Sequence, residues 1–473
     1  MPSPNSVKIL DVCKVAPATY SQDQSATELS LPLTFYDSTW LKFPPTQNLF
    51  FYKFTEHSTK SAVFHSSIFP TLKQSLAETL VHFRPLAGHL TWPPSNPSRP
   101  VIIYNFPNHG VPLALAESDT DFDQYVTTEI QDAAAARPYV PELHISETMA
   151  WTMALQVTLF PGKGFCIGIT THHAIFDGKS AFMFLKAWAD MSKKMQNEKL
   201  LPVTLSQELI PSFDRTVIKD PAEFESMYLN HWLAVNGLES QHSNARSLKV
   251  SNFFGNIPND FVRSSFYLSP ENIKKIKDRV ILYYQKQKNS AKRLHLSTFV
   301  LTCAYALVCM VKSKGVSNKK VAFVFGVDCR NRSITNPPIP LNYFGNAIVL
   351  HDLVVEAEDF VDENGVATVA EKLSDYINGL EKGLLEGAKE RLERLSHIGD
   401  DLLKFGVAGA TRLAFYNMDF GWGKPVKVEI PSINVNALSV MEGREGNGVE
   451  IGLGLMKNEM EAFASFFAQG LAN

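Results

Sequence analysis

The sequence predicts an α/β protein of two domains. The chain has 473 residues, which is more than a single hydrophobic core usually organises. Short apolar runs typical of strands occur along it, together with longer segments in which apolar residues recur every three or four positions, as in helices. Hydrophobic residues form 45% of the chain and charged residues 20%, the proportions of an ordinary globular protein.

Charge and cysteine usage exclude several classes of protein. The formal net charge is −3, whereas a general nucleic-acid binder needs a basic surface, so we expect no nucleic-acid partner. The cysteines are scattered and form no CxxC pair, so we expect reduced, buried thiols rather than disulfides or a metal site: Cys13, Cys166, Cys303, Cys309 and Cys329. Residues 1–7 lack the pattern of a secretory signal. The best candidate for a membrane span, residues 299–311, is shorter than the required length of about 20 residues. These features predict a cytoplasmic protein without a membrane partner.

The first part of the chain combines strands with one helix. Residues 31–37 open a β-rich region, and residues 48–54 form an apolar, aromatic strand candidate. Residues 68–82 carry leucines along one side at helical spacing. The Pro-Leu-Ala-Gly sequence at 85–88 ends this predicted helix.

A β-hairpin followed by a helix is predicted next. Its strands are residues 154–160 and 165–171, joined by a turn at residues 161–164 that contains a proline and two glycines. His173 follows the return strand. From residue 179 to 191 the apolar positions share one face of a helix.

The boundary between the two domains is predicted near residue 200. Residues 195–221 contain prolines, mixed polarity and little periodicity, as expected of a crossover segment. We therefore divide the chain into an N-terminal domain at 1–200, a linker at 201–224 and a C-terminal domain at 225–473.

The second half again contains strand and helix candidates. Residues 265–268 and 321–327 are typical of strands. A serine–proline pair at 269–270 predicts a helix start, with the serine as N-cap and the proline at the first helical position. Another helix is expected at 297–312, and residues 367–395 predict one long, charged, amphipathic helix or a helix pair.

Two motifs carry the functional signal. His173 and Asp177 form an HxxxD sequence that closes on Gly178, and a histidine that leaves a strand into a turn is a plausible general base. Residues 419–425, Asp-Phe-Gly-Trp-Gly-Lys-Pro, form a second signature near the C-terminus. The order and separation of HxxxD and DFGWG resemble those of the plant BAHD family of acyl-CoA-dependent acyltransferases. The resemblance covers nearly the whole chain.

This resemblance implies the two-domain coenzyme A-dependent acyltransferase fold. Each domain of that fold has a mixed β-sheet flanked by helices, and the active-site channel lies between them. The implied activity is transfer of an acyl group from coenzyme A to a hydroxyl of a phenolic or flavonoid glycoside. Malonyl is the favoured donor group, with His173 as general base and no covalent enzyme intermediate.

The same resemblance implies acyl-CoA as co-substrate, no permanently bound cofactor, no metal and a monomer. Two alternatives remain open. One is a hydroxycinnamoyl or aliphatic acyl-CoA transferase that acts on another alcohol or amine. The other is a non-catalytic relative that binds acyl-CoA or a phenolic ligand.

Asp177 has two possible roles. It could orient His173 as the aspartate of a catalytic triad does, or it could pair with an arginine and hold the loop. The resemblance favours the second role, with Arg330 as the partner and Arg332 as the fallback. His172, next to the candidate base, should point elsewhere and serve in packing, because neighbouring side chains of a strand face opposite sides.

The DFGWG segment also has two readings. Gly421 and Gly423 on either side of Trp422 suggest a tight turn with a packed indole, which is a framework role. In a catalytic role an N–H of this segment, which begins at Asp419, would reach the oxyanion. The resemblance favours the framework role. Upstream, Thr411 is a candidate oxyanion donor, with an ordinary loop threonine as the alternative.

Further matches concern the acyl donor and the subgroup. Coenzyme A carries phosphates, so Lys274, Lys275 and Lys277, together with Ser297 at a helix start, are candidate acyl-CoA-binding residues; a solvated helix face is the alternative for the lysines. Lys179 is the candidate partner of a malonyl carboxylate.

Residues 342–346, Asn-Tyr-Phe-Gly-Asn, resemble the YFGNC motif of the subgroup that acylates anthocyanins and other phenolic glycosides. In this chain Ala347 stands in place of the cysteine, a change that loses little packing. Residues 81–88 and 296–299 resemble the same subgroup.

Overall fold

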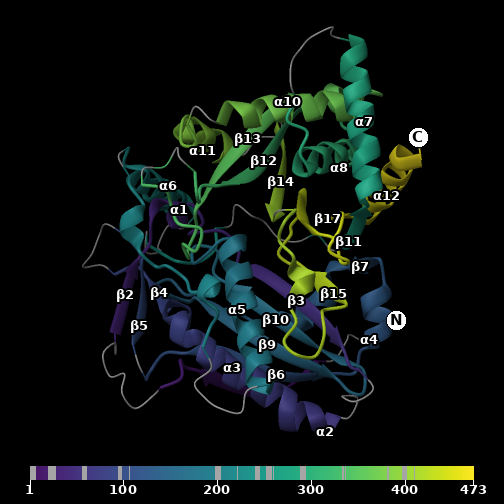
Figure 1. The fold of residues 1–473 in the computed structure, drawn as a ribbon. Coiled ribbons are helices and arrows are strands. Elements are labelled where there is room, and N and C mark those ends of the chain that lie inside the picture. Colours follow the sequence, from purple (N-terminus) through teal and green to yellow (C-terminus); the bar gives the residue numbers. More distant parts are fainter. Residues whose placement is uncertain are drawn as a thin grey trace.

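The computed structural model describes residues 7–19, 28–55, 61–93, 99–105, 107–197, 204–220, 222–239, 246–251, 258, 260–287, 294–332, 335, 337–380, 383–396, 402–409 and 411–472. In these segments the chain forms three β-sheets with helices packed against them (Figure 1).

A six-stranded sheet forms the centre of the first half. Strands β6 and β9 run parallel and the other neighbours run antiparallel, so the sheet is mixed. In spatial order its strands are β1 (Val7–Val15), β6 (Val111–Ser118), β9 (Met153–Phe160), β10 (Gly164–Thr171), β3 (Thr46–Lys53) and β15 (Lys427–Glu429).

A seven-stranded sheet forms the centre of the second half, and it is mixed as well, because β12–β14 and β14–β16 are parallel pairs. In spatial order its strands are β13 (Ile348–Glu356), β12 (Lys320–Asp328), β14 (Leu402–Gly409), β16 (Ala437–Glu442), β17 (Val449–Met456), β11 (Phe261–Leu268) and β7 (Ile130–Asp132). A smaller antiparallel sheet contains β2 (Glu28–Pro32), β5 (Val101–Asn105), β4 (His89–Thr91) and β8 (Met149–Trp151).

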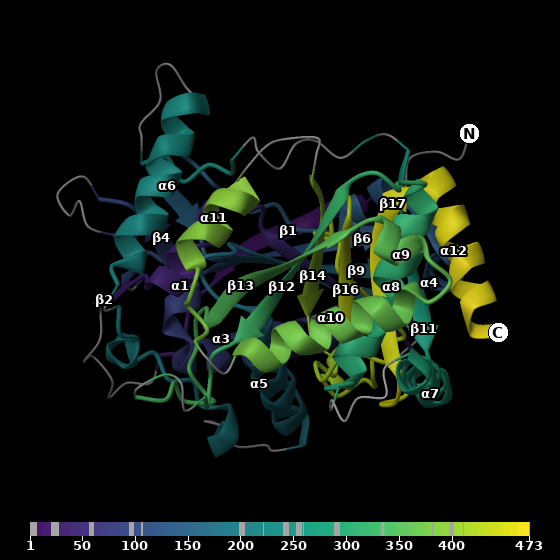
Figure 2. The ribbon, with the colours of Figure 1, turned by 90° about the horizontal axis from the view of Figure 1, so that it is seen from above.

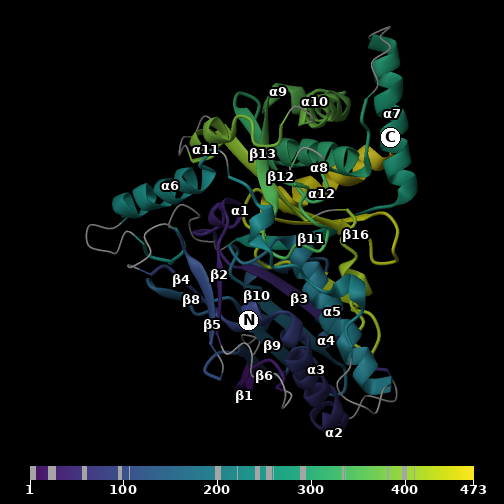
Figure 3. The same ribbon diagram turned by 60° about the vertical axis from the view of Figure 1, so that its left-hand side comes forward.

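Helices cover both large sheets. In the first half these are α1 (Phe35–Ser38), α2 (Ser61–Val63), α3 (Phe69–His82), α4 (Phe122–Thr127) and α5 (Gly178–Asn197). In the second half they are α6 (Phe224–Glu239), α7 (Pro270–Gln287), α8 (Thr298–Lys314), α9 (Glu358–Val361), α10 (Gly365–Gly379), α11 (Ala388–Ser396) and α12 (Lys457–Ala472). Seen from above, α8 and α10 lie over the strands of the second half (Figure 2). Helix α6 lies next to α1 at the side of the molecule (Figure 3).

Most predicted elements are confirmed with shifted ends. The predicted hairpin is the antiparallel pair β9–β10, and its turn contains Gly162 at φ +71°. Ser269 caps α7 by accepting a hydrogen bond from the Asn272 N–H at 3.1 Å, as its serine–proline start predicts. The segment 367–395 is a helix pair, α10 and α11. Residues 31–37 differ from the prediction, because the strand ends at Pro32 and a capping box between Thr34 and Asp37 starts α1.

Two short strands lie in the sheet of the other half. Strand β15 comes from the second half of the chain but pairs with β3, and β7 comes from the first half but pairs with β11. A single boundary near residue 200 would assign β7 and β15 to the wrong sheets. The two halves are therefore joined by strand pairing as well as by the chain that links them.

Each large sheet has its own buried apolar cluster. Residues 300–311 of α8 are all buried, which confirms a core helix there. Among the described segments, none of the helices combines the length and the apolar character that crossing a bilayer requires.

Candidate active site

His173 lies in the short connection between β10 and α5. The strand ends at Thr171 and the helix begins at Gly178, so the turn consists of His172 and the HxxxD motif. The Ile175 N–H donates to the His172 carbonyl at 3.0 Å, and the Ala181 N–H donates to the Asp177 carbonyl at 2.9 Å. These bonds close the turn and lead directly into the helix.

The imidazole of His173 is surrounded by aromatic rings. It stacks on Trp40 with ring centroids 4.2 Å apart and planes 4° from parallel, and Phe43 meets it edge-on at 5.7 Å. Its Nδ1 atom is buried and has no hydrogen-bond partner among the described residues. Burial lowers the pKa of His173 to about 4, so the ring is neutral at neutral pH. A neutral imidazole is the form that can accept a proton.

The backbone of His173 is held by residues from both halves of the chain. The Asn346 side-chain amide donates to the His173 carbonyl at 3.2 Å. The same amide and the Asn346 backbone N–H donate to Asp37 Oδ1 at 3.1 and 2.9 Å. Asp37 in turn accepts from the N–H and the hydroxyl of Thr34, both at 2.9 Å. A network of buried hydrogen bonds therefore fixes the position of the candidate base.

Asp177 faces away from the imidazole and binds Arg330. The two side chains are fully buried and make two contacts, Nη1–Oδ2 at 2.8 Å and Nη2–Oδ1 at 3.1 Å. The carboxylate also accepts from the N–H groups of Ser180 and Ala347, both at 3.0 Å. These four bonds occupy Asp177. The predicted pairing with Arg330 is present, and no triad contact with His173 is found among the described residues.

Arg330 connects several segments at the end of β12. Its remaining N–H groups donate to the carbonyls of Tyr343 and Gly345 at 3.1 and 2.9 Å, and to Asp328 at 2.8 Å. The fallback partner Arg332 donates instead to the Asp328 carbonyl at 2.6 Å. A guanidinium with all its donors used can stay buried without a large penalty.

Lys179 joins this cluster from the outside. Its Nζ atom lies 3.0 Å from Asp328 Oδ2, and the Lys179 side chain is 36% exposed. Although burial raises the pKa of Asp328, the positive charges of Arg330 and Lys179 bring it below its usual value. Two cations and two carboxylates thus balance each other. Lys179 can bind a donor carboxylate only by exchanging or sharing its present partner.

The Asn-Tyr-Phe-Gly-Asn segment belongs to the site. Besides the contacts of Asn346, the Phe344 ring packs edge-on against Phe176 at 5.4 Å. Gly345 has φ +150°, and a Cβ atom there would lie 2.5 Å from the Arg215 guanidinium. Ala347 is fully buried where its N–H binds Asp177. From the sequence this segment indicated only a subgroup; the asparagine directly after its glycine was the available signal for a structural role.

The DFGWG segment packs on the far end of α5. Asp419 accepts from the N–H groups of Gly421 and Gly423 at 2.8 and 3.0 Å, and from Lys193 at 2.9 Å. The Phe420 carbonyl accepts from Ser192 and Gln196 of the same helix at 2.8 and 2.7 Å. At a rise of 1.5 Å per residue, Lys193 is about 24 Å along the helix from Asp177.

The Trp422 indole meets the Phe165 ring edge-on at 6.3 Å. Both glycines beside it have the positive φ angles of a tight turn, +106° at Gly421 and +95° at Gly423. This geometry describes a brace on α5. It does not bring a donor of the segment to His173.

Thr411 follows β14 and is partly buried. Two residues later, the Leu413 side chain lies against Gly178 at the start of α5, within van der Waals distance of where a Cβ would be. The segment that begins at Thr411 therefore runs close to the HxxxD turn.

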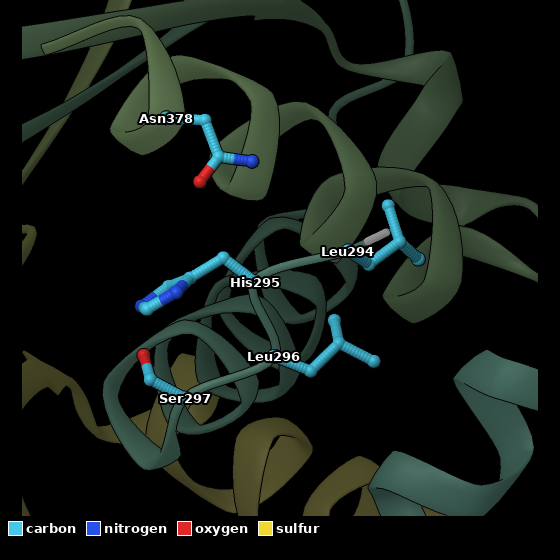
Figure 4. Close-up of a pocket in the computed structure, with 5 residues that line it drawn as sticks. All are labelled: Leu294, His295, Leu296, Ser297 and Asn378. Atoms are coloured by element: carbon cyan, nitrogen blue, oxygen red, sulfur yellow. The ribbon is translucent and has the colours of Figure 1, made fainter. Parts of the chain in front are cut away.

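The candidate acyl-CoA residues lie on two helices of the second half. Lys274, Lys275 and Lys277 are exposed on α7. Ser297 caps α8, with its hydroxyl accepting from the Val300 N–H at 3.3 Å. It also lines a cavity of about 460 Å³ together with Leu294, His295, Leu296 and Asn378 (Figure 4). The structure does not bring the three lysines and Ser297 into direct contact with His173.

Sequence reasoning missed Trp40, Asp37 and Asn346. They lie far from HxxxD in the chain and only the fold brings them to it. In the described part of the chain, no group of three or more His, Cys, Asp or Glu side chains is arranged to hold a metal ion.

Comparisons with known proteins agree over the whole length. A family model described as the Transferase family matches residues 6–469. Phenolic glucoside malonyltransferase 1 of Arabidopsis thaliana is 39% identical, with 99% of this chain and 98% of that protein aligned. Agmatine coumaroyltransferase of Arabidopsis thaliana is 37% identical, with 99% and 100% aligned. The crystal structure of vinorine synthase is similar with a TM-score of 0.65 at 22% identity, covering 97% of this chain and 96% of that one.

Proposed function

We propose that this chain, a member of the Transferase family of BAHD acyltransferases, transfers a malonyl group from malonyl-CoA to a glycoside. The family membership makes it an acyl-CoA-dependent acyltransferase. The proposed acceptor group is a sugar hydroxyl of a phenolic or flavonoid glycoside. The choice of donor and acceptor is supported by the 39% identity to a phenolic glucoside malonyltransferase over nearly the full length of both proteins. The chemical step is supported by one observation above all, the neutral imidazole of the half-buried His173, held in its fixed turn.

In the proposed reaction, His173 Nε2 accepts the proton of the sugar hydroxyl while that oxygen attacks the thioester carbonyl. The tetrahedral intermediate then expels the coenzyme A thiolate, which takes the proton back from the imidazolium. The products are the malonate ester and free coenzyme A, and the enzyme forms no covalent bond. Arg330 and two backbone N–H groups occupy the oxygens of Asp177, so this residue holds the turn. Its negative charge also acts against the lowering of the His173 pKa by burial.

The proton on the other ring nitrogen also needs a place. Both Nδ1 of His173 and Oδ1 of Asn346 are buried and have no hydrogen-bond partner in the described segments, while the Asn346 amide nitrogen already binds the His173 carbonyl. We propose that Nδ1–H donates to this oxygen when substrates bind. This bond selects the tautomer in which Nε2 is free to act as a base.

The other site residues keep their proposed roles. Lys274, Lys275 and Lys277 supply positive charge for the phosphates of coenzyme A, and Ser297 lies at a helix start beside a cavity. The Thr411 hydroxyl donates to the oxyanion, a role supported by the course of its segment next to Gly178. Asp419, Gly421, Trp422 and Gly423 serve as the framework of α5.

We further propose that the enzyme is a cytoplasmic monomer that holds no permanent cofactor. The halves 1–200 and 225–473 act as two domains joined by the linker 201–224, with β7 and β15 exchanged between their sheets.

A second candidate function is transfer of a coumaroyl group to an amine. It is favoured by the 37% identity to agmatine coumaroyltransferase, again over nearly the full length. The chemistry at His173 would be unchanged, because an amine can lose its proton to the same base. The two candidates differ in the pocket, where one needs a partner for the malonyl carboxylate and the other needs room for an aromatic ring.

The test is a matrix of donors and acceptors. Malonyl-, acetyl- and coumaroyl-CoA are each combined with a phenolic glucoside, a flavonoid glucoside and agmatine, and free thiol and product mass are measured. Malonylated glucosides should dominate. Coumaroyl transfer to agmatine alone would select the second candidate. Coenzyme A binding without turnover of any pair would indicate a non-catalytic relative.

Two variants test the partner of the malonyl carboxylate. Lys179→Ala should raise KM for malonyl-CoA by about one to two orders of magnitude and leave that for acetyl-CoA nearly unchanged, the loss of one charge-assisted hydrogen bond. The matched variant Asp328→Asn releases Lys179 from its present partner and should lower KM for malonyl-CoA. An equal change for both donors would make Lys179 a structural residue.

A further inference from the structure

The imidazole of His173 must carry a positive charge during the reaction, in a site where few groups can stabilise it. This inference rests on the proposed role of His173 as the base. The ring takes up a proton at each turnover, yet Asp177, the carboxylate whose charge favours the protonated ring, is committed to Arg330. The adjacent His172 is buried and neutral, because burial lowers its pKa to about 3, and it supplies no negative charge. A triad enzyme solves the same problem with a carboxylate hydrogen-bonded to the imidazole.

The Trp40 indole is the surface closest to this developing charge. Its ring lies 4.2 Å from the imidazole, nearly parallel at 4°, well within the 6 Å over which a cation interacts with an aromatic face. Tryptophan has the strongest negative potential of the aromatic faces. Only 8% of the Trp40 side chain is exposed, so little water weakens the interaction.

Trp40 is also held in place. Its backbone N–H donates to the Asp37 carbonyl at 3.0 Å, and Asp37 is the residue that anchors Asn346 and, through it, the His173 backbone. Phe43 packs edge-on against both rings, at 4.9 Å from Trp40 and 5.7 Å from His173. The indole and the imidazole are therefore fixed to the same network and cannot easily slide apart.

We propose that Trp40 is a positioning residue for the reaction, whose indole face orients the His173 ring and stabilises the imidazolium formed in the transition state, in place of a triad carboxylate. Stacking restricts rotation of the imidazole, and the π face lowers the energy of the charged form more than that of the neutral form. The expected contribution is about a two- to thirtyfold increase in kcat, from the usual range of cation–π interactions.

Ring-fluorinated tryptophans at position 40 test the proposal, because fluorine weakens the negative potential of the face with little change in shape. With malonyl-CoA and a phenolic glucoside, kcat should fall stepwise with the number of fluorine atoms, by up to about thirtyfold, while KM and Tm change little. The same replacements at Trp188 are the matched control. That indole is fully buried and packs edge-on to Phe420, with its N–H bound to the Leu72 carbonyl at 3.1 Å. There kcat should stay constant.

The indole N–H of Trp40 offers an alternative explanation for any effect at this position, and one further variant tests it. Its Nε1 is buried without a partner among the described residues, so it could instead bind a substrate atom. A benzothienyl analogue at position 40 keeps the face and removes the N–H. Wild-type kcat in this variant supports the face. A loss in this variant without a loss on fluorination overturns the proposal.

A second measurement does not depend on turnover. The pKa of His173, followed by NMR in enzyme with labelled histidine and assigned with His173→Gln, should fall by between about 0.4 and 1.5 pH units as fluorination weakens the face. Loosened packing alone would admit water and raise this pKa toward 6.5. A constant or rising pKa overturns the role of Trp40, whereas a falling pKa in an enzyme without acyl transfer would leave the stacking intact and reject the proposed function.

Discussion

At the scale of single residues, the imidazole of His173 combines a flat contact with an indole and a buried ring nitrogen that has no hydrogen-bond partner in the part of the chain that the structure describes. Burial lowers its pKa to about 4, so the neutral form is available throughout the neutral range. The adjacent His172 is also neutral, but its Nδ1 atom accepts from the Ala174 N–H at 3.3 Å and its ring is buried in the turn. Two neighbouring histidines therefore have different roles because the turn points them apart.

Replacing His173 by alanine tests this difference. We expect kcat to fall by about 10²- to 10⁴-fold with acyl-CoA binding preserved, since the proposed general base is lost. Initial rates and calorimetric titration with the coenzyme measure the two effects. The matched variant His172→Gln should lower Tm but keep the kcat of the folded enzyme within a few-fold. Near-wild-type turnover of His173→Ala would reject it as the base.

At the scale of elements, the turn before α5 is joined to the end of β12 by one ion pair. Asp177 belongs to the first half and Arg330 to the second, and at most 1% of either side chain is exposed. Removing one partner of such a pair leaves a buried, uncompensated charge. The turn that carries the candidate base therefore depends on contacts from the sheet of the other half.

A double-mutant cycle measures this coupling. Asp177→Asn and Arg330→Ala should each destabilise the fold by about 3–5 kcal/mol and lower activity in parallel. The double variant should cost clearly less than the sum, because neither charge is then left alone. Thermal unfolding and initial rates provide the values. Strictly additive losses would mean that the two side chains act independently.

Because the DFGWG segment packs on the far end of α5, a change in this segment should lower the stability of the fold and leave kcat nearly unchanged. Gly421 has φ +106°, which L-residues rarely adopt, and a Cβ there would meet the Gln196 amide at 2.1 Å. Gly421→Ala should lower Tm by several degrees, at a cost of about 1–3 kcal/mol, and keep kcat of the folded fraction within about threefold. Gly315→Ala is the control for the backbone alone, since Gly315 has φ +62° with nothing within 4 Å. A hundredfold loss of kcat at unchanged Tm would assign the motif to catalysis.

Elements were predicted well where one local pattern dominates. The hairpin β9–β10 and the helices α5, α7 and α8 appear where apolar spacing and caps indicate them. Residues 31–37 are predicted to open a β-rich region. The bonds between Thr34 and Asp37, with Asn346 as a distant partner, turn them into α1 instead. A local pattern cannot report a hydrogen bond to a residue three hundred positions away.

At the scale of the whole molecule, several histidines are buried in neutral form. Burial lowers the pKa of His172 to about 3 and that of His173 and His351 to about 4, all below the ordinary value of 6.5. The unfolded chain therefore binds more protons than the folded protein between pH 6.5 and about 4. Stability is complete above pH 6.5 and is lost as the pH falls through this window.

The free energy of unfolding should fall by up to about 1.4 kcal/mol per pH unit for each of these histidines as the pH is lowered. Urea unfolding between pH 7 and 5 measures it, in a range above the titration of ordinary carboxylates. His351→Asn removes one titrating group from the second half, where His351 Nδ1 bonds the Tyr376 hydroxyl at 3.1 Å, and should reduce the slope by one histidine. Stability that does not change over this range would contradict the buried neutral state.

The sequence by itself determined the family, the class of reaction, the candidate base and most of the secondary structure. HxxxD and DFGWG are local in the chain, and helix and strand periodicity is local too, so both can be recognised without coordinates. The pairing of Asp177 with Arg330 came from the resemblance, and the structure contains it.

Only the tertiary structure decided what surrounds the candidate base. Trp40, Asp37 and Asn346 reach His173 from distant parts of the chain, and β7 and β15 cross into the sheets of the opposite halves. The physical reason is that stacking, buried hydrogen bonds and strand pairing depend on distances in space. The spacing of residues in the sequence determines their distance in space only within one turn, helix or hairpin.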